Sequence, residues 1–149
     1  MAYLIDTSLL ARLANTADVQ YPVAVGAIVE LHRRGEILHV TPQVLVEFRS
    51  VATRPIHSNG LGLSPAEAAT QAAGFEVIFP LLADTQAVYP AWKSIVEGLD
   101  VIGKQVHDAR LLAVCHVHGV THLLTFNVSH FARMAGFGPG IVVVDPASI

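Results

Sequence analysis

Short apolar runs alternate along the chain with longer segments in which apolar residues recur at helical spacing. The short runs are typical of buried strands, while the longer segments begin at capping residues or prolines and stop at glycines or prolines, as helices do. We expect strands at Ala2–Ile5, Ile37–Val40, Val77–Leu82, Val120–Thr125 and Ile141–Val144, the third of them weakened by Pro80. We expect helices at Leu9–Asn15, Pro22–Arg34, Pro42–Thr53, Pro65–Gly74, Asp84–Glu97 with an interruption near Pro90, and Val106–His118, then a short helical turn after Asn127.

This alternation predicts a parallel sheet covered by helices on both faces, which is a three-layer α/β/α fold. No repeat, low-complexity tract or charge block divides the sequence, and we expect one domain spanning residues 1–149. Ligands of such sheets bind at the carboxyl ends of the strands. Asp6 and Asn127 each lie just after an expected strand, so both should face that edge.

The composition narrows the class of protein. Hydrophobic residues make up 52% of the chain and charged residues 14%, which excludes a disordered protein. The formal net charge of −3 argues against a broad basic face for nucleic acid, although local contacts stay open. So apolar a chain also suggests that a partner or a second copy covers part of its surface. The single cysteine, Cys115, is expected to be a thiol in the core.

We expect no membrane span and a cytoplasmic location. The longest segment without Asp, Glu, Lys or Arg runs from Leu111 to Ala132, but it carries four histidines and an asparagine. No basic residue precedes Asp6, so the basic region that opens a secretory signal is missing.

Three acidic residues are candidates for chemistry. Asp6 starts an Asp-Thr-Ser junction, where it could equally cap the following helix. Glu47 lies at the shoulder of an apolar helical stripe, so its side chain reaches either solvent or a site. Asp108 is the strongest signal, because its helix is apolar nearly all round and a carboxylate entering a dry core costs several kcal/mol without a partner. Arg110 points away from Asp108 on the helical wheel, which favours a metal ion as the counter-charge.

Together with the amide oxygen of Asn127, these carboxylates would form an all-oxygen site. Such sites suit Mg²⁺ or Mn²⁺, which are hard cations that prefer oxygen ligands. With phosphodiesters, these ions lower the pKa of a bound water and polarise the phosphoryl group. Hydrolysis of nucleic acid is therefore the chemistry that the residues favour.

Four motifs resemble, in order and spacing, those of the PIN-domain ribonucleases, and more closely the VapC-type toxins of bacterial toxin–antitoxin pairs. The motifs span most of the chain and lie on a matching pattern of helices and strands. They are Leu4-Ile5-Asp6-Thr7-Ser8, Val46-Glu47-Phe48, Val106-His107-Asp108-Ala109-Arg110-Leu111 and Leu123-Leu124-Thr125-Phe126-Asn127.

The resemblance implies a parallel sheet of about five strands and Mg²⁺- or Mn²⁺-dependent cleavage of RNA. It also implies a homodimer and a small cognate antitoxin as partners. Carried over to this sequence, it makes Asp6, Glu47 and Asp108 the metal-binding acids, with Asp6 and Asp108 as the principal ligands and Asn127 at a fourth position. Ser8 and Thr125 would be hydrogen-bonding groups behind the acids.

Two departures leave alternatives open. The fourth position, often an aspartate in the family, is Asn127, and His130 stands where an acid is expected before Phe131. Both changes remove negative charge, so the number of metal ions, one or two, stays open. The alternative to a nuclease is a catalytically weakened PIN-like module that binds or regulates a partner.

Other residues admit two interpretations each. Arg49 and Arg54 either steer RNA towards the acids or are solvated surface charges. Tyr89 and Trp92 are expected in the core or in a dimer interface, and stacking on a base is the less favoured role. His116 and His118 are two residues apart on a helix and cannot chelate one ion together.

Overall fold

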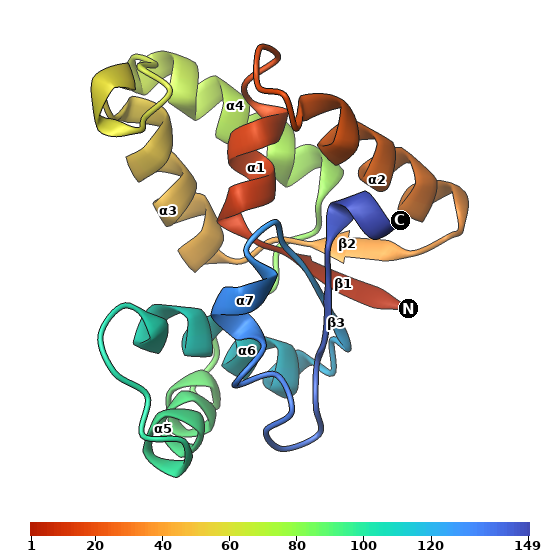
Figure 1. Ribbon diagram of the computed structural model, residues 1–149, viewed down its shortest axis with the longest axis vertical. Helices are drawn as coiled ribbons and strands as arrows, with labels where there is room; N and C mark the ends of the chain where they lie inside the picture. Colours follow the sequence, from red (N-terminus) through yellow and green to blue (C-terminus); the bar gives the residue numbers. More distant parts are fainter.

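The computed structural model describes residues 1–149 and contains a parallel four-stranded sheet between two groups of helices (Figure 1). The strand order is β2-β1-β3-β4. The strands are β1 (Ala2–Ile5), β2 (Ile37–His39), β3 (His122–Leu124) and β4 (Val142–Val144). The expected three-layer α/β/α architecture is confirmed, with four strands in place of about five.

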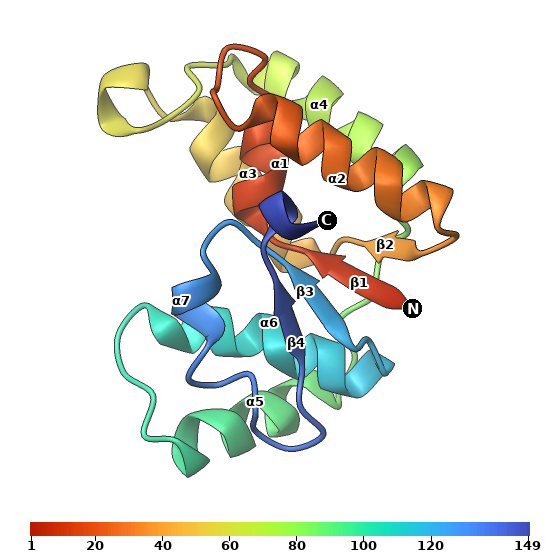
Figure 2. The same ribbon diagram turned by 45° about the vertical axis from the view of Figure 1, so that its right-hand side comes forward.

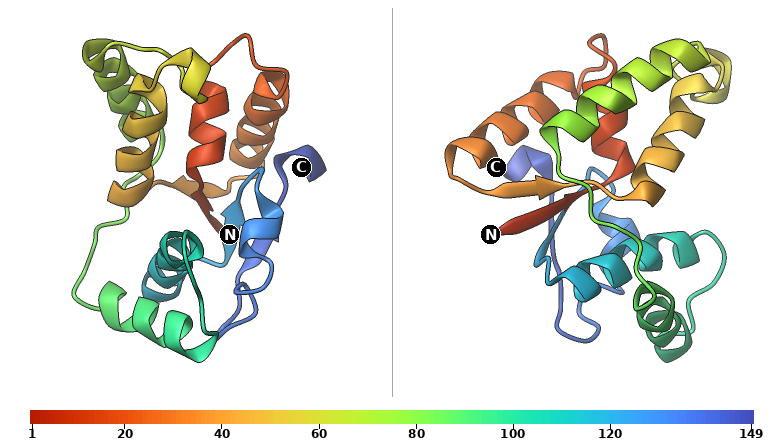
Figure 3. Two further views of the ribbon diagram at one scale, coloured as in Figure 1. Left: turned by 60° about the vertical axis from the view of Figure 1, so that its left-hand side comes forward. Right: turned by 180° about the vertical axis from the view of Figure 1, so that it is seen from behind.

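Seven α-helices cover the sheet. Helices α1 to α4 lie on one side of the strands and α5 to α7 on the other, as the views in Figures 2 and 3 show. Their bounds are α1 (Thr7–Leu13), α2 (Tyr21–Arg33), α3 (Pro42–Thr53), α4 (Pro65–Ile78), α5 (Val88–Gly98), α6 (Gln105–His118) and α7 (Val128–Phe131). The two longest, α4 and α6, have 14 residues, and no helix has both the length and the apolar character needed to cross a bilayer.

Local signals set the ends of several helices. The Thr41 hydroxyl accepts a hydrogen bond from the backbone N–H of Val44 at 3.1 Å and caps α3. Ser64 and Glu67 form a reciprocal capping box at the start of α4. Helix α6 ends at Gly119, whose φ of +67° lies in the left-handed region that glycine adopts without strain.

The expected strand at Val77–Leu82 and the helix end at Gly74 are wrong. Helix α4 continues through Gly74 to Ile78, because Phe75 on its buried face packs into the core and one exposed glycine costs a helix only about 1 kcal/mol. What remains of a fifth strand is a single parallel bridge between Val40 and Leu81. The Pro80 carbonyl still accepts a hydrogen bond from the Val40 N–H, but the proline offers no donor to extend the ladder.

The helix expected over Asp84–Glu97 starts later than predicted. Helix α5 begins at Val88, so Pro90 falls in its first turn rather than interrupting it. A proline is tolerated there because the first N–H groups of a helix have no partner within the helix.

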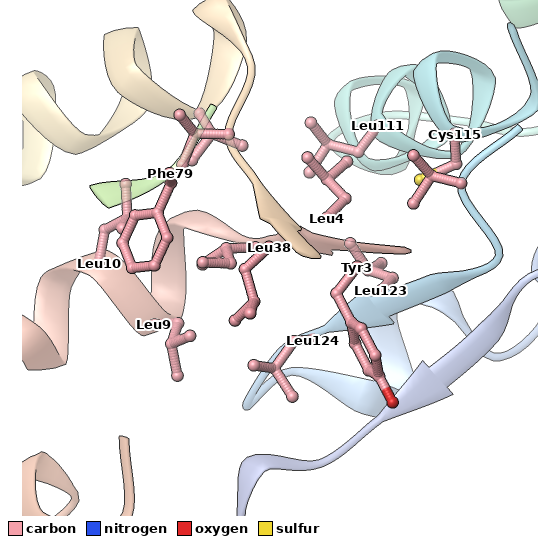
Figure 4. Close-up of a cluster of buried hydrophobic side chains, with 14 of the residues drawn as sticks. Tyr3, Leu4, Leu9, Leu10, Leu38, Phe79, Leu111, Cys115, Leu123 and Leu124 are labelled. Carbon is pink, nitrogen blue, oxygen red and sulfur yellow. The ribbon is translucent and has the colours of Figure 1, made fainter. Parts of the chain in front are cut away.

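The core packs against both faces of the sheet. In Figure 4, Leu10 and Phe79 lie on one side of the strands and Leu111 and Cys115 on the other. Cys115 is fully buried, and burial raises the pKa of its thiol to about 12, which confirms it as an inert core residue.

The topology fixes where a ligand can reach the sheet. From β1 the chain passes to β2 on one side, and it returns to place β3 on the other side. The carboxyl ends of β1 and β3 therefore flank the point where the strand order reverses, which is where open parallel sheets bind ligands.

Candidate active site

A polar hollow of about 280 Å³ opens at the carboxyl ends of β1 and β3. Four of the residues singled out in the sequence line it, although they come from distant segments: Asp6, Glu47, Asp108 and Asn127. They are carried by the end of β1, by α3, by α6 and by the segment that starts α7. The other lining residues are Thr7, Ser8, Ala11, Arg12, Val51, Asn59, His130 and Phe131.

Asp6 is buried at the floor of this hollow, with 6% of its surface exposed. It occupies the cap position of α1, but its side chain makes no capping hydrogen bond. Instead its Oδ2 accepts hydrogen bonds from the hydroxyls of Ser8 at 2.9 Å and Thr125 at 2.7 Å. Capping therefore does not explain this aspartate, and its Oδ1 makes no hydrogen bond within the chain.

Backbone groups orient the two hydroxyls towards Asp6. Ser8 Oγ accepts a hydrogen bond from the N–H of Phe126 at 3.1 Å, and Thr125 Oγ1 accepts one from the N–H of Asn127 at 2.9 Å. A hydroxyl carries one proton, so each hydroxyl accepts from the backbone and donates to the carboxylate. Ser8 and Thr125 thus hold Asp6 through one of its carboxylate oxygens.

Glu47 is half-buried at the wall of the hollow, and both of its carboxylate oxygens accept hydrogen bonds. The Thr7 hydroxyl donates to Oε2 at 2.7 Å, and the Gln43 side-chain amide donates to Oε1 at 2.9 Å. The same amide nitrogen also donates to the carbonyl of His107 at 2.9 Å. Gln43 therefore joins α3 to the first turn of α6, beside Asp108.

Asp108 is half-buried rather than enclosed in a dry core, and no basic side chain pairs with it. Arg110, which points away as predicted, pairs with Asp84 at 3.0 Å. Burial and the negative charges of Asp6 and Glu47 together raise the pKa of Asp108 to about 6, against the opposing effect of nearby histidines. An uncompensated negative charge therefore faces the hollow.

The oxygen atoms around the hollow are the kind of donor that a hard metal ion prefers. No group of three or more His, Cys, Asp or Glu side chains is arranged to hold one ion together. The available donors are the free Oδ1 of Asp6, the Asp108 carboxylate and the Asn127 side-chain oxygen, which are all hard oxygen ligands. Mg²⁺ is commonly held by one or two carboxylates and several waters, so this donor set fits such an ion. Both Glu47 oxygens are already engaged by Thr7 and Gln43.

The two arginines proposed to contact RNA do not line this hollow. Arg49 is exposed on α3 and faces a separate depression between α3 and α4. Arg54 is exposed at the end of α3, where it donates to the Ser50 hydroxyl at 3.4 Å. Their contact with RNA stays a prediction.

Sequence reasoning missed Gln43 and Arg12. Gln43 precedes Glu47 by four residues on one helix face, a spacing at which side chains meet, so the signal was present. Arg12 lies one turn after Ser8 on α1, and its guanidinium donates to the Gln20 side chain at 3.0 Å and lies over the Phe126 ring. No pattern in the sequence marks Arg12 as a residue of the hollow.

A second hollow, of about 210 Å³, lies between α1, α2 and α4 and is lined by hydrophobic side chains only. It carries no carboxylate, imidazole or thiol, so the polar hollow is the candidate active site.

Comparison with known proteins agrees with this architecture. The family model described as "PIN domain" matches residues 3–136. Among solved structures, VapBC2 from Rickettsia felis, bound to a promoter DNA fragment, aligns with a TM-score of 0.71 at 14% identity over 97% of this chain and 98% of that one. VapBC-1 from nontypeable Haemophilus influenzae aligns with a TM-score of 0.70 at 15% identity over 98% of each chain.

VapC20 from Mycobacterium tuberculosis, described as a sarcin-ricin loop cleaving toxin, aligns with a TM-score of 0.63 at 20% identity, over 87% of this chain and 93% of that one. No curated protein sequence gives a significant match. The parallel sheet with an acidic hollow at its carboxyl edge and the family match lead to one conclusion. The chain belongs to the PIN domain family.

The raised pKa of Asp108 makes stability depend on pH. Between the ordinary pKa of 3.8 and about 6, the unfolded chain ionises first, so wild-type stability should fall as pH rises and then level off above 6. Asp108→Asn should remove this loss. At pH 7 the variant should be more stable than wild type by about 1 kcal/mol, a figure that allows for the screening of a half-exposed group by solvent. Near pH 3.8 the two proteins should be equally stable.

Chemical denaturation across this pH range in metal-free buffer measures the difference. Glu76→Gln, on an exposed position of α4, controls for the loss of a surface charge. If the difference in unfolding free energy between Asp108→Asn and wild type were constant with pH, or grew towards acid, the electrostatic description of Asp108 would be contradicted.

Proposed function

We propose that this PIN-domain protein is a Mg²⁺- or Mn²⁺-dependent endoribonuclease that hydrolyses RNA phosphodiester bonds. One observation carries the proposal: the free Oδ1 of Asp6 and the unpaired carboxylate of Asp108 face the same hollow. A cation between them would relieve the repulsion that raises the pKa of Asp108. A bound divalent ion supplies positive charge to the phosphoryl oxygens and acidifies a water molecule.

The chain's own residues would position the ion and the substrate. Ser8 and Thr125 hold one oxygen of Asp6, which leaves the other directed at the ligand. Asp108 completes the acidic pair, and Asn127 adds an oxygen without adding charge. Glu47, held by Thr7 and Gln43, would add its negative charge at the wall of the hollow.

Metal-dependent cleavage tests this proposal. After dialysis against EDTA, the protein should cleave single-stranded RNA only when Mn²⁺ or Mg²⁺ is restored. Asp6→Asn and Asp108→Asn should each lower the cleavage rate by about 100-fold or more, because each removes a charge from the ion site. Glu76→Gln should cleave at the wild-type rate.

Cleavage that persists in EDTA or survives Asp108→Asn would defeat the assignment of the site. Calorimetric titration with Mn²⁺ provides a readout that does not depend on turnover. Wild-type protein that binds Mn²⁺ and RNA without cleaving would favour the alternative, a PIN-like binding or regulatory module.

We further propose that the protein is the toxin of a cytoplasmic toxin–antitoxin pair and is inhibited by a small antitoxin. Several structural neighbours are VapBC assemblies, which supports such a partner. An arginine of the antitoxin would fit the acidic hollow, because a guanidinium pairs with a carboxylate in bidentate fashion.

A small protein encoded by a short reading frame just upstream of the one for this chain would be the candidate to test. Changing its inhibitory arginine to alanine should restore RNA cleavage in the mixture, and Asp108→Asn should weaken the complex by about tenfold or more, as measured by calorimetry. Inhibition that withstands replacement of every arginine in the partner would contradict this mode of inhibition.

We also propose a homodimer, since several large apolar side chains remain exposed. Val77 on α4 is 88% exposed, and Val46 on α3 is 68% exposed. Sedimentation equilibrium should give twice the 15.9 kDa mass of one chain. A mass of one chain at micromolar concentration would exclude a stable dimer.

A further inference from the structure

We propose that the hollow formed by Tyr89, Trp92 and Arg110 binds an unpaired base of the RNA substrate, next to the acidic hollow. This inference rests on the proposed ribonuclease function and names a binding site for its substrate. The hollow has a volume of about 350 Å³, and its remaining lining residues are Thr85 and Val88. Liquid water occupies about 30 Å³ per molecule, so there is room for a planar heterocycle.

Two aromatic rings on α5 form one wall. Tyr89 and Trp92 are three residues apart, with ring centroids 5.7 Å apart and planes inclined by 31°. Tyr89 is 65% exposed, so its ring is neither in the core, as the sequence suggested, nor covered by another part of the chain. Exposed rings of this kind are the surfaces on which unpaired bases stack.

The indole N–H of Trp92 and the guanidinium of Arg110 already have partners within the chain. The indole N–H of Trp92 donates to the carbonyl of Val106 at 2.6 Å. Arg110 donates to the Gln43 side chain at 3.1 Å and pairs with Asp84 at 3.0 Å. The indole and the guanidinium are therefore held in place before a ligand arrives, which lowers the entropy cost of binding.

These hydrogen bonds also decide which part of RNA fits. The donors of Arg110 are directed at Gln43 and Asp84, and Asp84 offsets its charge, so a phosphate would gain little here. Flat apolar faces remain, and they suit the faces of a base. Recognition by stacking tolerates any base, so we expect this hollow to select single strands rather than a sequence.

One side chain links this hollow to the acidic one. Gln43 accepts from Arg110, which lines the base hollow, and donates to Glu47, which lines the acidic hollow. Hydrogen bonds through a single amide thus connect a residue of one hollow to a residue of the other. A strand whose phosphate lies at Asp108 could place a neighbouring base between α5 and α6.

Fluorescence of Trp92 tests the proposal, because Trp92 is the only tryptophan of the chain. A short single-stranded oligoribonucleotide, titrated into the full-length protein in EDTA, should quench this fluorescence saturably. An abasic strand with the same phosphates, and duplex RNA of the same sequence, should not. Tyr89→Ala should weaken binding roughly 5- to 100-fold, as expected for the loss of one base–aromatic stack.

Two variants serve as controls for Tyr89→Ala. Tyr89→Phe keeps the aromatic ring and loses only the hydroxyl, so it should bind RNA like wild type. Val19→Ala removes an exposed apolar group from the loop between α1 and α2 and should leave RNA binding unchanged. In the cleavage assay, Tyr89→Ala should raise KM and leave kcat at the wild-type value.

Two results would overturn the proposal: equal quenching by the abasic strand, or unchanged affinity of Tyr89→Ala for RNA. The second result could also come with a loss of dimers in Tyr89→Ala. That combination would identify this face as a contact between two copies of the chain. Metal-dependent cleavage by wild type without quenching would reject the base site and leave the nuclease function standing. Quenching without any cleavage would reject the nuclease function and leave the base site standing.

Discussion

The pair of hydroxyls that holds Asp6 is the interaction on which the rest of the site depends. Asp6 ends β1, Thr125 follows β3, and these strands are neighbours in the sheet, so the contact exists only when the sheet has formed. A carboxylate this deeply buried costs several kcal/mol unless it is hydrogen-bonded. Ser8 and Thr125 offset that cost through one oxygen, and the other oxygen stays free to bind a ligand.

The second acid of the site, Asp108, is not held by hydrogen bonds. Asp108 has no hydrogen-bond donor or basic partner of its own, and its raised pKa reflects burial and the charges of Asp6 and Glu47. The Asp6 carboxylate is thus held in place by hydrogen bonds, whereas the Asp108 carboxylate has no partner within the chain. This asymmetry makes the hollow ready for a cation, because binding neutralises a repulsion that is already present.

Much of this arrangement follows from local sequence signals. The strand at Ala2–Ile5 and the stop at Gly119 were predicted from apolar runs and backbone preferences, which act over a few residues. The ends of the expected strands also predicted that Asp6 and Asn127 face one edge of the sheet. Helical spacing could not show that Asp108 is half-exposed, since burial depends on which elements pack around α6.

The errors have the same origin. Gly74 and Pro90 were read as helix breakers, but each lies where its particular cost is small, on an exposed position or in a first turn. The contacts of Arg110 with Gln43 and Asp84 were missed because they join α6 to α3 and to the segment before α5. No local pattern encodes contacts between residues so far apart in the chain.

The contacts of the basic groups near the site bear on how a protein with a net charge of −3 would bind RNA, as proposed. Arg12 is directed at Gln20, and Arg110 at Asp84 and Gln43, so neither neutralises the acidic pair. The acidic hollow therefore repels a phosphate backbone until a cation occupies it. If the protein binds RNA as proposed, its affinity must come from the cation and from groups that do not rely on charge. Aromatic rings beside the hollow meet that requirement, because stacking on a base is insensitive to the sign of the surrounding field.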